Sequence, residues 1–329
     1  MEGAYAQEDP QGIEAKLLTR PMLAQSYATV SIGLCATVEL ENTLLLAERI
    51  LKMNDPHVNV QEVIVATPNR SLALRLERRD SRLIVLLESK REGKTSALNK
   101  IISRATGDIL VIASADIKMA RDAIPKLVKS LIDHEDWGLA DSRVQMADSN
   151  RLLMSKVNGL LWAVHNATLD DLDSEERLAH AGDMFAVRRK LISPVPSITN
   201  DDAHIALEVR KQGFKVKRVP KAVVWITGPT SPTDYITQRS RILRGHLELI
   251  RKFRTTPTTF EFSMSSRPSR NAKLLLKILT KLGPTYIPAL VTALYLELFS
   301  FQLAVLRTIF NTKNKPWKMA LTTKPSLNT

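Results

Sequence analysis

The strongest constraint on the fold is an alternation, over residues 29–132, between short runs of β-branched residues and stretches with helical periodicity. Runs that predict strands cover residues 29–34, 60–66, 83–86 and 109–114, and stretches that predict helices cover residues 43–52, 94–104 and 120–132. Such strand–helix–strand units place parallel strands side by side with helices on the faces of the sheet. The sequence therefore predicts an α/β fold with a mostly parallel, Rossmann-like sheet and flanking helices. Because ligands of such sheets bind at the carboxyl ends of the strands, residues that follow each run are the first candidates for function.

The next part of the chain is less regular. The expected elements are a strand over residues 138–145, a long helix over 151–168, a solvated acidic loop over 170–176, and a loop over 181–187 that enters a strand. A further helix is expected to begin at Asn200 and to end near Gln212, where Gly213 follows. Asn200 is a good N-cap, and the two aspartates after it suit the dipole of a helix start.

The chain changes character after Pro257. Residues 258–329 hold ten basic and two acidic side chains, so they carry +8 of the net charge of +13. Lys273, Lys277 and Lys281 recur every four residues, which places them on one face of an amphipathic helix. We therefore divide the chain into an N-terminal extension (1–26), an α/β domain (27–256) and a basic, apolar, helical C-terminal region (257–329).

An apolar segment lies within this C-terminal region. Residues 287–310 are long enough to span a bilayer as a helix, but Glu297, Gln302 and Arg307 interrupt the apolar run in different directions. The segment fits neither a clean membrane span nor a one-sided surface helix. Together with the lysine face, it predicts a region that associates with a membrane, either peripherally or by insertion.

Composition narrows the possible partners and the compartment. The net charge of +13 and a pI near 9.8 favour partners that carry phosphate: nucleic acids, nucleotides or anionic membranes. Nucleic acid is the weakest of these, because aromatic stacking clusters, helix-turn-helix signals and zinc-finger spacing are lacking. Cys35 is the only cysteine, which excludes an internal disulfide and fits a reducing compartment. The acidic N-terminus lacks the pattern of a signal peptide, so export is not expected.

Four polar motifs stand at the ends of the expected elements. They are residues 91–99 (REGKTSALN), Ser114-Ala115-Asp116, Asn200-Asp201-Asp202, and residues 238–241 (QRSR). In this order and spacing the motifs resemble those of the family 2 glycosyltransferases, and the resemblance covers roughly residues 29–253. The segment from Trp317 to Lys324 is similar to the tail of membrane-associated archaeal members. The resemblance implies the fold called GT-A, inverting sugar transfer from a nucleotide donor, and a requirement for Mg²⁺ or Mn²⁺.

The resemblance also implies residue roles. Asp202 matches the catalytic base, with Asp201, Gln238 and Arg241 in support; Glu39, Lys94, Asn99 and Asp116 match donor-binding positions; Asp116 matches the metal ligand; and Gly182 and Asp183 match the acceptor-side loop. These residue types suit the chemistry. Hard divalent cations prefer carboxylate oxygens, an acceptor hydroxyl needs a general base, and a guanidinium fork matches phosphate oxygens. Each motif also has a purely structural interpretation: a helix N-cap for Asp116, charged helix starts for the aspartate pair, and a solvated basic face for Arg241.

Three departures from the family pattern sharpen the expectation. Ser114 replaces the first aspartate of the metal motif, so metal binding by the protein alone is expected to be weak. The residues after the second expected strand, 66–69, lack the aspartate that commonly contacts the base, so the donor can be a UDP- or a GDP-sugar. Ile242 replaces the tryptophan of processive synthases, which favours transfer of a single sugar.

The expected function is that of a hexosyltransferase. It moves one sugar onto a hydroxyl of a lipid-linked or membrane-presented glycan, at the cytoplasmic face of the cell membrane. Two alternatives remain open at this point: transfer to a polyprenyl phosphate, and a catalytically weak protein that binds nucleotide sugars.

Overall fold

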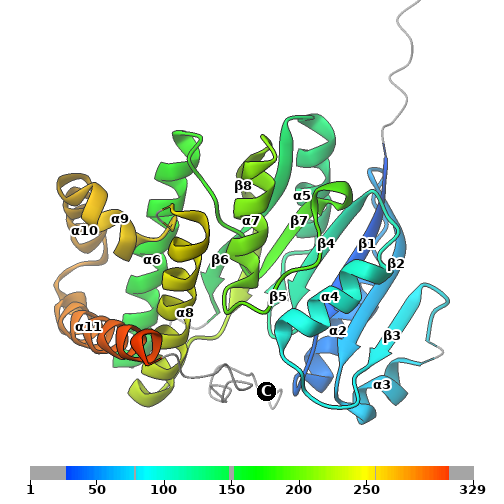
Figure 1. The fold of residues 1–329 in the computed structure, drawn as a ribbon, viewed down its shortest axis with the longest axis horizontal. Coiled ribbons are helices and arrows are strands. Elements are labelled where there is room, and N and C mark those ends of the chain that lie inside the picture. The colour runs from blue at the N-terminus through cyan, green and yellow to red at the C-terminus, as the bar shows by residue number, and fades with distance from the viewer. Residues whose placement is uncertain (1–26, 78, 148–151, 256, 311–329) are drawn as a thin grey trace, which may run out of the picture.

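The computed structural model describes residues 27–77, 79–147, 152–255 and 257–310. The predicted N-terminal extension and the motif from Trp317 to Lys324 lie outside the described residues. Over the described residues the chain forms one twisted sheet with helices on both faces and a helical layer at one end (Figure 1).

The sheet has eight strands in the order β3-β2-β1-β4-β7-β6-β8-β5. The strands are β1 (Ala28–Cys35), β2 (Val58–Thr67), β3 (Leu83–Leu87), β4 (Ile109–Ser114), β5 (Lys118–Met119), β6 (Trp137–Met146), β7 (Met184–Arg188) and β8 (Lys215–Ile226). Strands β3, β2, β1 and β4 are mutually parallel, and β8 is parallel to β6. Strand β7 is antiparallel to both β4 and β6, and the short β5 is antiparallel to β8. The expected mostly parallel α/β sheet is thereby confirmed.

Two hydrophobic cores hold helices on the two faces of the sheet. One face is covered by α2 (Leu40–Leu51), α3 (Arg70–Leu76) and α5 (Ala123–Asp133), and the other by α4 (Lys94–Arg104) and α7 (Asp201–Lys211). Alternate residues of the central strands enter opposite cores: Val111 belongs to the first and Leu110 to the second. Burial on both faces explains why these strands read as nearly continuous apolar runs.

The register of the sheet brings three loops to one edge. Cys35 at the end of β1 pairs with Ala66 of β2 and with Ser114 at the end of β4. Because β7 runs antiparallel to β4, its first residue, Met184, pairs with Ala113 near the carboxyl end of β4. The loops after β1 and β4 and the loop before β7 therefore meet at the same edge.

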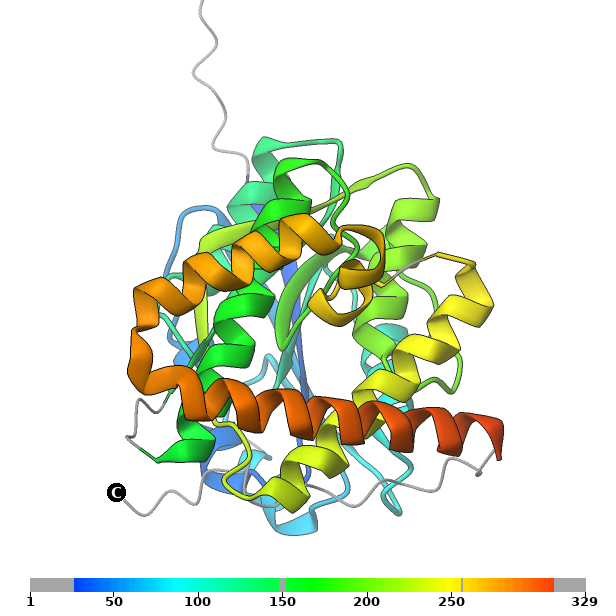
Figure 2. The ribbon, with the colours of Figure 1, turned by 90° about the vertical axis from the view of Figure 1, so that its left-hand side faces the viewer.

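A third core forms the helical layer at one end of the sheet. It contains α6 (Leu153–Ser174), α8 (Pro232–Phe253), α9 (Phe260–Ser266), α10 (Pro268–Leu282) and α11 (Ile287–Ile309). Figure 2 shows α11 lying across the outer side of α6 and α8, and α10 lying across α6. The apolar residues of α6 and α11 meet through Val157, Leu160, Ala289 and Ala293, whose small or branched side chains allow close approach of the two helices.

Buried polar contacts join α11 to α8. Arg239 on α8 forms ion pairs with Glu261 on α9 and with Glu297 on α11, the latter at 2.7 Å. The Tyr235 hydroxyl donates to Glu297 at 2.6 Å, and Arg307 donates to Ser240 Oγ at 2.9 Å. Two of the three polar residues that interrupt the apolar segment, Glu297 and Arg307, thus make contacts within the protein.

The acidic segment was predicted wrongly as a solvated loop. Helix α6 continues to Ser174, so most of residues 170–176 are helical. Asp171 and Glu175 form ion pairs with Arg267 and Arg270 of the basic C-terminal region. The acidic and basic segments, about 95 residues apart in the chain, are partners.

The Arg239 cluster predicts a large stability effect. We expect Arg239→Met to destabilise the fold by about 3 kcal/mol, because it leaves two largely but not fully buried carboxylates without their cation. Arg75→Met is the matched control: Arg75 pairs with Glu41 on the surface, where both side chains are roughly half exposed, and its loss costs about 0–1 kcal/mol. Urea unfolding of both variants checks the difference. Equal midpoints would contradict a structural role for the cluster.

Candidate active site

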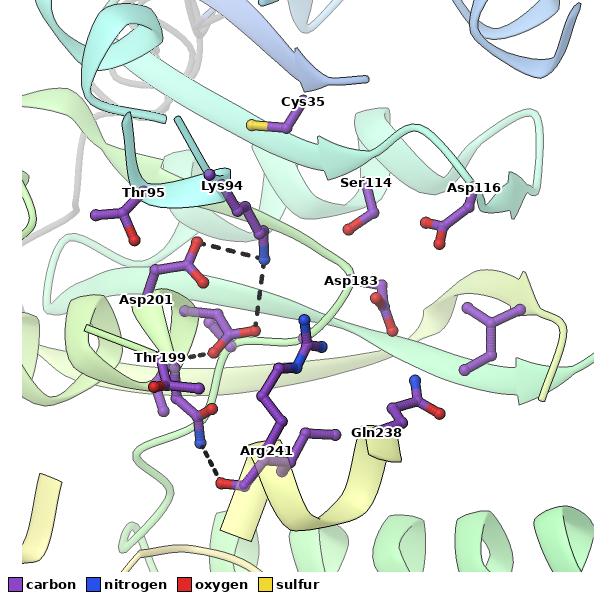
Figure 3. Close-up of a pocket in the computed structure, with 18 of the residues that line it drawn as sticks. Cys35, Lys94, Thr95, Ser114, Asp116, Asp183, Thr199, Asp201, Gln238 and Arg241 are labelled. Atoms are coloured by element: carbon purple, nitrogen blue, oxygen red, sulfur yellow. Dashed lines mark hydrogen bonds and ion pairs between the residues drawn. The ribbon is translucent and has the colours of Figure 1, made fainter. Parts of the chain in front are cut away.

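A cavity of about 890 Å³ opens at the edge where the strand ends meet. Its walls include Cys35, Glu39, Lys94, Asn99, Ser114, Asp116, Gly182, Asp183, Asp201, Asp202, Gln238 and Arg241. The cavity therefore brings together every site residue that the sequence indicated. Figure 3 shows side chains from the strand ends, α4, α7 and α8 surrounding a common space, among them Lys94, Asp183, Asp201 and Arg241.

Two carboxylates face the cavity from neighbouring strands. Asp116 follows β4, and Asp183 precedes β7, where its carbonyl oxygen accepts a hydrogen bond of 2.9 Å from the Ser114 amide. Burial, followed by repulsion from Asp116, raises the pKa of the Asp183 carboxyl to about 6. This pair forms a local excess of negative charge that a cation would relieve.

A lysine balances the acids on the opposite wall. Lys94 begins α4 directly after Gly93, whose φ of 106° is in the region that favours glycine. The Lys94 ammonium lies 3.3 Å from Asp201 and 3.8 Å from Asp202. Burial lowers the pKa of Lys94, but the two aspartates outweigh it and raise the pKa overall.

The two aspartates differ in access to solvent. The side chain of Asp201 is 6% exposed and that of Asp202 is 31% exposed, so Asp202 is the carboxylate that a bound molecule can reach. Burial raises the pKa of Asp201, while Lys94 opposes the change. Asn200 occupies the N-cap position, but the prediction of a side-chain cap was wrong: its amide donates to the Ile242 carbonyl of α8 at 3.0 Å.

Gln238 and Arg241 enter the cavity from α8. They lie three residues apart, so they share one helix face, and Figure 3 shows both side chains directed into the cavity. Burial lowers the pKa of Arg241, and the charges of Asp201 and Asp202 oppose that change. The guanidinium fork of Arg241 can donate parallel hydrogen bonds to the oxygens of a diphosphate.

Two further residues line the cavity with their polar atoms already engaged, and a third, Cys35, contributes a neutral thiol. The Glu39 carboxylate accepts hydrogen bonds from the backbone amides of Thr37 and Val38, at 2.8 and 3.0 Å. The Asn99 amide exchanges two hydrogen bonds with the backbone of Val195, at 2.7 and 2.8 Å. Burial raises the pKa of the Cys35 thiol to about 12, so the thiol remains protonated. Glu39 and Asn99 therefore shape the walls of the cavity in this structure.

Motif reasoning missed the far wall of the cavity. Trp162 and His165 on α6, His180 before β7, Arg239 on α8 and Glu261 on α9 also line it. Their sequence signal is slight: Trp162 and His165 are three apart on an expected helix, and His180 stands two residues before Gly182. The C-terminal region thus supplies part of the cavity wall through α9.

The chain matches the family described as Glycosyltransferase like family 2 over residues 41–245, and it belongs to that family. This confirms the resemblance drawn from the motifs. A probable glycosyltransferase of Bacillus subtilis, YdaM, is 22% identical over 171 residues, which cover 49% of this chain and 40% of that protein. An N-acetylglucosaminyltransferase of Azorhizobium caulinodans is 24% identical over 187 residues, which cover 50% of this chain and 45% of that protein. The chain spans less than half the length of these two curated relatives.

Solved structures share the fold. The mannosyltransferase PcManGT from Pyrobaculum calidifontis, in complex with GDP-Man and Mn²⁺, has a TM-score of 0.57 and 18% identity, with 92% of this chain and 94% of that chain covered. Mannosyl-3-phosphoglycerate synthase from Rubrobacter xylanophilus has a TM-score of 0.51 and 14% identity, with 69% and 76% covered. These similarities confirm the expected GT-A type of fold.

The raised pKa of Asp183 predicts a pH-dependent stability cost. Between the ordinary carboxyl pKa of 3.8 and about 6, the folded protein binds more protons at this site than the unfolded chain, so ionisation of Asp183 weakens the fold as pH rises. We expect the stability of Asp183→Asn relative to wild type to be higher at pH 8 than at pH 5, by about 1 kcal/mol in the free energy of unfolding or roughly 2–4 °C in Tm. Thermal unfolding in EDTA checks this. A Tm difference from wild type that is the same at both pH values would contradict it.

Proposed function

We propose that the protein is an inverting glycosyltransferase that moves a single sugar from a UDP- or GDP-sugar to a hydroxyl group. The observation that carries this proposal is the arrangement of one cavity: Asp116 and Asp183 on the strand ends, the Lys94-bound Asp201 and Asp202 opposite, and Arg241 between the two walls. Membership of the family and the fold shared with a mannosyltransferase that binds GDP-Man support it.

The residues at the strand ends suit a hard divalent cation. The carboxylate oxygens of Asp116, with Asp183 beside them, are the donors that Mg²⁺ and Mn²⁺ prefer, and their mutual repulsion is relieved by positive charge. Asp116 would hold the ion and Ser114 would add a hydroxyl, so two or more ligands would come from the donor's phosphates. The ion would offset the charge that develops on the departing diphosphate. The Mn²⁺ held by the Pyrobaculum enzyme supports this choice of cofactor.

The wall of α7 suits the role of general base. Asp202 is accessible, and its carboxylate lies 3.8 Å from the Lys94 ammonium, so it is placed where it can accept the proton of an acceptor hydroxyl. Asp201 is buried and keeps Lys94 in place. Gln238 and Arg241 would contact the diphosphate and the acceptor.

The base role predicts a selective loss of turnover. With a donor identified by screening UDP- and GDP-sugars in Mg²⁺ and Mn²⁺, we expect Asp202→Asn to lower kcat by about 10²–10⁴-fold with little change in donor KM. Asp122→Asn, on an exposed helix start outside the cavity, is the matched control and keeps wild-type kinetics. Full activity of Asp202→Asn would overturn the base assignment and favour a polyprenyl phosphate acceptor, which is already ionised. Donor binding without turnover by wild type would favour a nucleotide-sugar-binding protein.

We also propose that the acceptor is presented at the cytoplasmic face of a membrane, on which the helical layer rests. The segment Pro284–Ile309 is long and apolar enough to cross a membrane, with a mean hydropathy of 1.8, and only 28% of its apolar stretch is buried. Its buried face is formed by Ala289, Ala293, Leu296, Ser300 and Ala304, and its exposed stripe by Ile287, Val291, Leu294, Tyr295, Leu298 and Ile309. Because Glu297 and Arg307 contact α8, we favour an α11 that lies in the interface with its exposed stripe among the lipids. The exposed Lys273, Lys277 and Lys281 of α10 would meet anionic headgroups.

This orientation predicts lipid-dependent sedimentation. We expect the double variant Val291→Asp, Leu298→Asp to lose binding to vesicles that contain phosphatidylglycerol, and replacement of the three lysines by glutamine to weaken binding by about 1 kcal/mol per lysine. The control carries aspartate at Leu45 and Leu74, which are equally exposed on α2 and α3. Point variants are preferable to truncation at Pro257, because truncation removes Glu261 and Glu297 from the Arg239 cluster. Unchanged vesicle binding by the first variant would argue against the membrane face.

A further inference from the structure

The cavity extends beyond the donor-side residues into a chamber, which we define as the space walled by α6, α8, α9 and the loop before β7. The polar and aromatic residues of this chamber are Trp162, His165, His180, Arg239, His246 and Glu261. Electrostatic interaction between His180 and Asp183 places the chamber next to the carboxylate pair of the donor side. The chamber therefore adjoins the place where the sugar would be transferred.

Asp141 orients one wall of the chamber. This carboxylate on β6 is fully buried, and its two oxygens accept hydrogen bonds from His180 Nδ1 and from the Gly182 amide, each at 2.9 Å. The other ring nitrogen of His180 lies 3.4 Å from His165 Nε2. Asp141 thus fixes both the histidine and the loop that carries Asp183. It is a positioning residue for the chamber and for the acceptor-side loop.

The charge of the chamber does not suit a phosphate. Arg239 forms ion pairs with both Glu261 and Glu297, so one guanidinium is paired with two carboxylates. Burial would raise the pKa of Glu261, but Arg239 lowers it to about 2, so this carboxylate is ionised. Burial lowers the pKa of His246 to about 4, and burial and His180 lower the pKa of His165, so both rings are neutral at pH 7. Among the described residues that wall the chamber, no cation is left without a carboxylate partner to bind a phosphate group.

Neutral polar groups and an aromatic ring remain. Trp162 and His165 meet edge to face with ring centroids 5.3 Å apart, and His165 meets His180 in the same way at 5.2 Å. An indole flank and several imidazole nitrogens match a ligand that presents C–H surfaces and hydroxyl groups. Resting on the proposed function, we propose that this chamber binds the acceptor of the reaction and that the part of the acceptor it holds is an uncharged sugar. Helix α9 completes the subsite, so the C-terminal region contributes directly to acceptor binding.

The test compares matched amphiphilic acceptors on the full chain. The probes are octyl glucoside, octyl mannoside and octyl N-acetylglucosaminide, with citronellyl phosphate as the phosphate counterpart. We expect saturation-transfer-difference NMR to detect binding of at least one glycoside without donor, and transfer assays to show no product from citronellyl phosphate. Binding of none of the three glycosides, or transfer to the phosphate, would overturn the assignment. Because the binding measurement needs no donor, it stands apart from a failure of the proposed transfer reaction.

Variants separate the chamber from the donor side. We expect His165→Asn and Trp162→Phe to raise the KM for the glycoside by tenfold or more, while donor KM and slow hydrolysis of the donor by water stay within twofold of wild type. His134→Asn is the matched control, because His134 also contacts a tryptophan ring, that of Trp137, but lies on the surface outside the cavity. Equal losses in donor hydrolysis and glycoside transfer would show a general structural role and contradict the proposal.

Discussion

Crowding of negative charge at one edge of the sheet is the constraint on which the site depends. Four aspartates from three separate segments line the cavity, and Lys94 is shared by the two on α7. The strand register forces Asp116 and Asp183 together, since β4 ends where β7 begins. Burial, and then repulsion from Asp116, raises the pKa of the Asp183 carboxyl. A ligand that brings a divalent cation relieves this repulsion. The folded protein therefore holds an unfavourable electrostatic free energy that ligand binding reduces.

Local periodicity was sufficient to predict the regular half of the fold. The helix expected over residues 94–104 and the strand expected over residues 109–114 coincide with α4 and β4. Both could be predicted because the spacing of their apolar residues is set within the element itself. The order of strands and the antiparallel direction of β7 depend on contacts between distant segments, which periodicity does not encode. The misread acidic residues 170–176 show the same limit. Their partners, Arg267 and Arg270, lie about 95 residues away, and without those partners the acids resemble a solvated loop.

The residues of the site likewise fall into those that the sequence could predict and those that depend on contacts between distant segments. Asp116, Asp202 and Arg241 stand in motifs whose order resembles a known family, and the structure brings them into one cavity. Trp162, His165 and Glu261 carry no motif, and they come together only because α6 packs against α9 and Glu261 of α9 pairs with Arg239 of α8. Asn200 illustrates a different cause: an N-cap side chain was expected from local chemistry, but packing against α8 offered the Ile242 carbonyl instead. Tertiary contacts therefore determine which polar side chains cap a helix and which line the cavity.

Helix α11 carries both polar and exposed apolar side chains because one of its faces packs against α8 and the other faces away from the protein. Glu297 reaches inward to Arg239 and Tyr235, and these contacts hold the α8 residues that wall the cavity. The outward stripe has no such partners within the described residues and exposes large apolar side chains. A helix designed only to span a membrane would not carry an inward glutamate, and a helix designed only to complete a soluble core would not expose this stripe. One helix thus contacts the α8 residues that wall the proposed acceptor chamber and also carries the exposed stripe of the proposed membrane face.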